Sequence, residues 1–134
     1  MKVVFIDYSQ QHHSDPAEAE VSSMQSGKFI QIRKDDTEYL IFSPKELAPY
    51  HTALVERFCQ EEGIEGAYDG AVKRFDIHDP AWVIAGGGKF EIDRAKKYIR
   101  LYDNSMAYGK FDPAGLKEKI LMIEELSDYE VSIV

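Results

Sequence analysis

The chain has a single cysteine, Cys59, among its 134 residues, and this excludes a disulfide within the chain. One free thiol fits a reducing compartment. No apolar run is long enough to cross a bilayer, and the first seven residues have neither the long apolar stretch nor the small-residue cleavage site of a signal peptide. We therefore expect a cytoplasmic protein.

Positive charge is also scarce. Lys and Arg number 16 against 24 Asp and Glu, which gives a formal net charge of −8. Nucleic acids and anionic membranes attract proteins through a positive field, so we expect neither as a partner. A small phosphorylated substrate is still compatible with this balance, because a few cations in a cleft act locally and exposed charges are screened beyond about 10 Å.

The length suits one compact domain over residues 1–134, with residues 1–27 as an N-terminal strand and loop extension, and we expect a monomer. Within that extension the polar stretch 9–27 is the one candidate for a long loop. No Walker-type Gly-Lys-Ser/Thr element is present, so nucleotide hydrolysis by that route is excluded. We expect no metal site and no cofactor.

Apolar periodicity predicts an α+β fold. A helix is expected over 49–62, ended by Gly63, and a second helix after Asp112-Pro113. Alternation predicts strands over 2–6, 28–33, 38–42, 82–85, 97–102 and 129–134, and the otherwise irregular segment 63–80 could hold another within 71–77. The prediction is therefore a mixed sheet of about six strands with two main helices, one on each face.

Two features of this pattern indicate an anion site. Three consecutive glycines follow the apolar strand 82–85, where glycine would continue a strand poorly but would let backbone N–H groups approach an anion. A bulge or a sharp corner without a ligand explains these glycines equally well. His51 lies in the first turn of the predicted helix, beside unpaired N–H groups that disfavour its charged form, so its ring should be neutral at pH 7. The plainer alternative is a solvated or capping histidine.

Three segments resemble the Janus/Ocnus family, which includes the phosphohistidine phosphatases. They are Tyr50-His51 with its amphipathic helix, Gly86-Gly87-Gly88, and Ser105-Met106-Ala107-Tyr108-Gly109 in this order and spacing. The likeness runs from about Lys28 to the C-terminus. It implies a mixed sheet with a helix on each face, and a metal-independent histidine phosphatase that hydrolyses the P–N bond of phosphohistidine in a protein or peptide. By the same resemblance, His51 is the catalytic residue, as a general base or as a nucleophile.

The resemblance also implies which residues hold the phosphoryl group. Lys28 shares a strand face with Ile30 and Ile32, although a strand-end lysine often simply extends to water. Lys89 stands where part of the family carries arginine, and it offers a point charge in place of a bidentate fork. The predicted substrate-binding residues are Lys28, Tyr50, Thr52, Gly86, Gly87, Gly88, Lys89, Ser105, Met106 and Ala107. The alternative function is a non-catalytic module of the same fold that binds phosphate or phosphoproteins.

Overall fold

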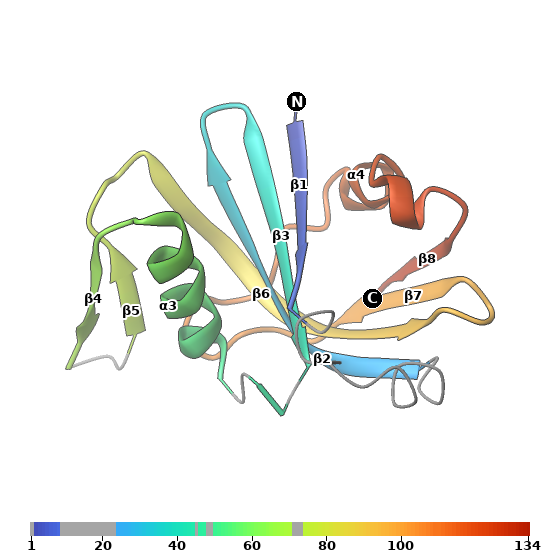
Figure 1. Ribbon diagram of the computed structural model, residues 1–134, viewed down its shortest axis with the longest axis horizontal. Coiled ribbons are helices and arrows are strands. Elements are labelled where there is room, and N and C mark those ends of the chain that lie inside the picture. Colours follow the sequence, from blue (N-terminus) through green and yellow to red (C-terminus); the bar gives the residue numbers. More distant parts are fainter. Residues whose placement is uncertain (1, 9–23, 45, 48–49, 71–73) are drawn as a thin grey trace.

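A six-stranded mixed sheet forms the centre of the molecule (Figure 1). The computed structural model describes residues 2–8, 24–44, 46–47, 50–70 and 74–134. The strand order is β1-β3-β2-β6-β7-β8; β1 pairs with β3 and β7 with β8 in parallel, and the other neighbours are antiparallel. The strands are β1 (Lys2–Asp7), β2 (Met24–Lys34), β3 (Thr37–Pro44), β6 (Trp82–Asp93), β7 (Tyr98–Tyr102) and β8 (Glu130–Ile133).

One helix covers each face of this sheet, as the sequence predicts. Helix α3 (His51–Glu62) packs with Ile30, Ile32 and Ile41 in one core. Helix α4 (Leu116–Leu121) and the short 3-10 helix η1 (Glu124–Leu126) cover the other face, over a core that contains Phe29 and Phe90. The α+β prediction is confirmed. No helix in the described ranges combines the length and apolar character needed to cross a membrane.

Helix α3 follows its sequence pattern closely. Leu54, Val55 and Phe58 form a fully buried stripe, and burying a side chain of this kind stabilises the fold by roughly 1.5–3 kcal/mol. Gly63 ends the helix with φ of 69°, a left-handed conformation that costs glycine little. The predicted start at residue 49 lies outside the described residues. Tyr50 is extended, so the helix begins at His51.

Strand β6 corrects the prediction that the strand ends at the glycines. It runs through all three of them to Asp93. The register shifts beside Gln31, so residues 85–86 form a bulge, and Gly86 has φ of +146°. A Cβ on Gly86 would lie 2.3 Å from the Lys110 carbonyl oxygen, and one on Gly88 would lie 2.5 Å from that of Tyr102. The strand is glycine-rich because neighbouring backbone leaves no room for side chains.

The segment after α3 holds more structure than expected. Strand β4 (Gly66–Asp69) pairs with β5 (Arg74–Ile77) as a separate hairpin, so β5 matches the predicted strand and β4 was missed. Two other element boundaries differ from the prediction. Residues 24–27, predicted as loop, belong to β2, and the rest of that loop, 9–23, lies outside the described residues. Helix α4 begins at Leu116 rather than directly after residue 113.

Candidate functional site

His51 lies at the start of α3 with its ring packed against the glycine strand. It is 7% exposed, and a Cβ on Gly87 would lie 2.8 Å from its Cδ2. Its Nε2 lies 2.9 Å from the Gly88 carbonyl oxygen. A carbonyl can only accept, so Nε2 carries the hydrogen and Nδ1 of the neutral ring carries the lone pair. Nδ1 has no hydrogen-bond partner in the described part of the chain and is not a buried atom, so solvent reaches it.

The surroundings favour the neutral form of this histidine. Burial is the main cause of the lowered pKa of His51, and the charges of Lys28 and Lys89 lower it further. The Gly88 carbonyl and the Asp103 carboxylate act in the opposite direction and favour the charged form. The predicted direction is therefore confirmed, with desolvation as the leading cause. At pH 7 the ring is a neutral imidazole with one available lone pair.

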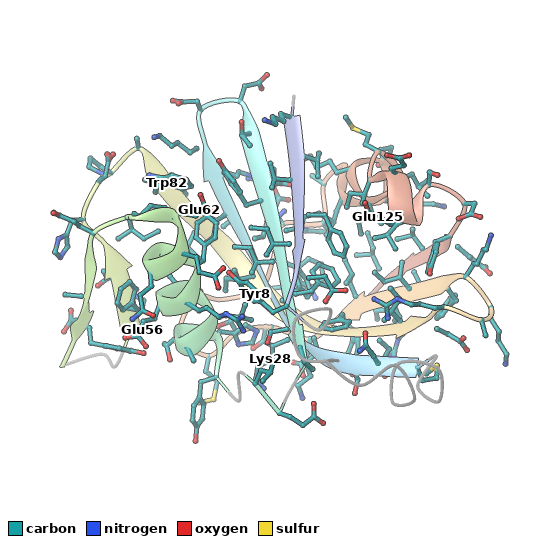
Figure 2. All side chains as sticks on the ribbon, in the orientation of Figure 1. Tyr8, Lys28, Glu56, Glu62, Trp82 and Glu125 are labelled. Carbon is teal, nitrogen blue, oxygen red and sulfur yellow. The ribbon has the colours of Figure 1, made fainter. Side chains whose placement is uncertain are left out.

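Two lysines face each other beside this ring. Lys28 on β2 is in register with Lys89 on β6. Their neighbours Phe29 and Phe90 belong to the core beneath α4, so strand alternation places both lysines on the α3 face. Figure 2 shows Lys28, in the middle of β2, near the first turn of α3. Like charges directly opposite on a sheet repel each other. A bound anion would reduce the repulsion between the two lysines.

The two lysines differ in their partners. Within the described residues Lys28 has no carboxylate partner, whereas Lys89 Nζ lies 3.1 Å from Asp103 Oδ2. The Lys89 charge and the Asn104 N–H together lower the pKa of Asp103. Sequence reasoning missed this carboxylate. The only signal for it was an acidic residue directly after a strand that adjoins the glycine strand.

The loop after β7 is closed by its own hydrogen bonds. Ser105 is 3% exposed and exchanges two backbone hydrogen bonds with Gly109, at 3.1 and 2.8 Å. Its Oγ accepts a third from the N–H of Tyr108, whose hydroxyl donates to the Phe75 carbonyl 2.6 Å away. Tyr108 therefore anchors the loop.

The same loop lies directly beside the strand that contacts His51. The Gly87 N–H donates to the Gly109 carbonyl at 3.1 Å, and the Gly87 carbonyl accepts from Phe111. Met106, at the tip, is fully exposed. In the described part of the chain, no hydrogen bond uses the N–H groups of Met106 and Ala107. These two donors are free to meet an anion, while the Gly87 N–H is engaged within the protein.

The structure thus brings most of the predicted residues to one place, from four segments distant in the sequence. Lys28, His51 and Lys89 lie together, with the glycine strand behind them and the 105–109 loop next to it. Tyr50 is 70% exposed, and Thr52 interacts with the Tyr68 hydroxyl. Ligand contacts of these residues stay a prediction. Among the described residues, no group of three or more His, Cys, Asp or Glu side chains is placed to hold a metal ion.

Comparison with known families identifies the family of the chain. The model of the Janus/Ocnus family (Ocnus) matches residues 9–130, which is nearly the whole chain. The chain therefore belongs to the Janus/Ocnus family. A search of curated proteins found no match.

Proposed function

We propose that this protein is a cytoplasmic, metal-independent phosphatase that hydrolyses the P–N bond of phosphohistidine in proteins or peptides. The observation that carries the proposal is His51: a neutral ring whose Nε2–H is fixed by the Gly88 carbonyl and whose Nδ1 is open, beside two facing lysines. The family membership and the resemblance to its phosphatases support the same function. A titratable group next to surplus positive charge is suited to phosphoryl chemistry.

The donors around His51 match the needs of phosphoryl transfer. Negative charge spreads over the equatorial oxygens in the transition state, so its stabilisation is the main task of the protein. Lys28 and Lys89 would supply charge, and the free N–H groups of Met106 and Ala107 would supply directed donors. None of these groups needs to move far, since strands and a hydrogen-bonded loop hold them.

His51 can act in either of two ways. As a general base, Nδ1 takes a proton from water while the water oxygen bonds to phosphorus and the P–N bond breaks. As a nucleophile, Nδ1 bonds to phosphorus itself, and water later releases phosphate. Both routes need the unprotonated Nδ1 that the Gly88 hydrogen bond leaves available.

The experiment is release of phosphate from a phosphohistidine peptide, followed by phosphorus NMR with chelator present and no added metal. We expect turnover by the wild type and a loss on the order of 10³-fold in His51→Ala. His78→Ala, at an exposed histidine after β5, is the matched control and should keep full activity. His51→Ala should also lose about 1–2 kcal/mol of unfolding free energy, because its hydrogen bond to Gly88 disappears.

The alternative is a non-catalytic module that binds a phosphorylated protein. The pairing of Lys89 with Asp103 favours this alternative, because Asp103 neutralises part of the positive charge that would stabilise the transition state of phosphoryl transfer. Binding of the phosphohistidine peptide by titration calorimetry, without phosphate release, would support this alternative. Phosphate release that survives in His51→Ala would contradict the role given to this residue.

A further inference from the structure

Asp103 is the acidic residue in this otherwise cationic site, and its backbone holds it there. It has φ of +66°, in the left-handed region that non-glycine residues seldom adopt. Its Oδ1 accepts from the Asn104 N–H at 2.9 Å, and its carbonyl accepts from Lys110 Nζ at 3.2 Å. Its Oδ2 is thereby directed to Lys89. A carboxylate fixed in this way repels a phosphoryl group, so phosphate binding alone does not explain it.

The position of Asp103 relative to His51 suggests what it contacts. His51 is almost fully buried, whereas the side chains of Asp103 and Lys89 are 38% and 46% exposed. The attacking and leaving atoms lie roughly in line through phosphorus. With the attack coming from the buried side, the leaving group faces the exposed side of the site. The Asp103 side chain is open to solvent beside Lys89 and within electrostatic reach of His51, so a leaving group on the exposed side could contact it.

We propose that Asp103 is a specificity-determining residue that selects substrates whose leaving group is a basic nitrogen, by accepting a hydrogen bond from the protonated imidazole of the phosphohistidine. The inference rests on the proposed function. When the P–N bond breaks, its electron pair stays on the ring nitrogen. A ring that carries a proton on its other nitrogen then departs as neutral imidazole, while an unprotonated ring would depart as an anion.

The carboxylate favours the protonated ring through a charge-assisted hydrogen bond. In the step itself, a bond forms from phosphorus to the water oxygen, and the water proton passes to His51 Nδ1. The products are inorganic phosphate and the neutral imidazole side chain of the substrate. A phosphate ester leaves as an oxygen and has no such cationic form, so Asp103 can offer it only repulsion.

The test is Asp103→Asn, which removes the charge and little else. Asparagine tolerates a left-handed backbone, and its Oδ1 can still accept from the Asn104 N–H. The matched control is Asp128→Asn, which also removes an aspartate paired with a lysine, Lys97, in an exposed pair. The specificity constant is measured for a phosphohistidine peptide and for para-nitrophenyl phosphate at pH 7.

We expect Asp103→Asn to lower the ratio of the two specificity constants, peptide over ester, at least about tenfold, the usual effect of one hydrogen bond to a charged group. Release of Lys89 affects phosphoryl binding for both substrates alike, so it cancels in the ratio. Asp128→Asn should leave the ratio unchanged. An Asp103→Asn ratio equal to that of the control would overturn the inference.

A second measurement keeps the inference testable if the ester reacts too slowly. The loss for the peptide should be larger at pH 8 than at pH 6, because at pH 6 solvent protonates the leaving ring without help. The titratable groups that interact with Asp103 are Lys89, Lys110 and the His51 ring. The His51 ring is neutral in most of this range, because its pKa is lowered from 6.5.

An equal loss at pH 6 and pH 8 would also contradict the role of Asp103. The two proposals fail separately. A wild type that releases no phosphate from the peptide ends the proposed function, whereas an active wild type with an Asp103→Asn variant like its control ends only this inference.

Discussion

The two faces of the sheet differ in how their charged side chains are paired. Beneath α4, Glu38 is fully buried and contacts both Arg33 and Lys119, and Arg33 also bonds to Asp112 at 2.9 Å. Each charge in that group has an opposite partner. Beneath the start of α3, two lysines lie beside a histidine, and the one carboxylate next to them, Asp103, pairs with Lys89 and not with Lys28. The charges on the α4 face are therefore balanced within the protein, whereas the positive charge on the α3 face would be balanced by a bound anion.

Contacts on the α4 face, where the charges are paired, also position the site on the α3 face, where Lys28 is unpaired; these are called the paired and the unpaired face below. Gln31 donates to the Asp112 carbonyl at 3.2 Å and accepts from the Asp112 N–H at 2.7 Å, which fixes the backbone of residues 110–112 against the sheet. That backbone is what excludes a side chain at Gly86, and Phe111 closes the space beside Gly88. The glycine strand in turn receives the His51 ring on its other side. Hydrogen bonds on the α4 face therefore hold in place the glycine strand against which the His51 ring packs.

The largest effect on this comparison should come from Glu38→Ala. It leaves Arg33 and Lys119 without their buried partner, and breaking a buried ion pair from one side costs about 3–5 kcal/mol. Urea unfolding should show a loss of this size. The activity of the folded fraction should not change, because the Gln31–Asp112 hydrogen bonds that hold residues 110–112 do not involve Glu38.

Two further variants control for this prediction. Asp128→Ala breaks an exposed pair and should have little effect on stability. Glu38→Gln keeps hydrogen-bonding capacity and gives a folded variant if Glu38→Ala does not fold. A Glu38→Gln variant as stable as the wild type would mean that the charge of Glu38 does not matter.

An intermediate effect is expected from the two lysines of the unpaired face. Lys28→Met should lower the specificity constant for the phosphohistidine peptide about tenfold or more, because Lys28 has no carboxylate to share its charge. Lys89→Met should lower it by a smaller factor that shrinks with added salt, since Asp103 already neutralises part of this exposed charge. Steady-state kinetics at two ionic strengths would measure both.

Stability gives an independent check on the same pair. Removing Lys28 should raise the free energy of unfolding slightly, on the order of a few tenths of a kcal/mol, because the cross-strand repulsion disappears. Removing Lys89 should raise it less, because the ion pair with Asp103 is lost as well. Lys97→Met, on an exposed pair elsewhere, serves as control. Equal kinetic losses for Lys28→Met and Lys89→Met at all salt concentrations would contradict the distinction drawn between them.

The smallest effect concerns pH. The pKa of His51 is lowered from 6.5, so between that lowered value and 6.5 the unfolded chain binds more protons than the folded one. Stability should therefore be lost as pH falls below 6.5, and the specificity constant should fall over the same range as Nδ1 becomes protonated. His51→Gln should remove this part of the pH dependence of unfolding. The same slope in both proteins would show that other groups cause it.

The sequence pattern correctly predicted those helices and strands that depend on residues close together in the chain. The stripe of Leu54 and Phe58 and the stop at Gly63 gave helix α3 within two residues, and alternation placed Lys28 on the face of Ile30. Alternation also predicted strands over 28–33 and 38–42, which form β2 and β3 and pair as antiparallel neighbours. Strand β4 was missed, because four residues carry too little pattern to stand out.

The glycine run shows where local reasoning fails. Glycine is unfavourable in a strand for reasons of entropy and packing, and from these alone the strand should end at Gly86. What keeps it a strand is the close approach of residues 110–111 and of Tyr102, which come from distant parts of the chain. No local signal could reveal that approach.

The sequence by itself determined the α+β class, helix α3 with His51 in its first turn, and the shared face of Lys28 and the isoleucines, because these depend on periodicity over a few residues. Only the tertiary structure decided that Lys28 faces Lys89, that Gly88 fixes the His51 tautomer, and that Asp103 joins the site. Those contacts depend on strand register and on a bulge, which long-range packing sets. The chemistry of the site therefore follows from pairings between segments that the sequence alone does not bring together.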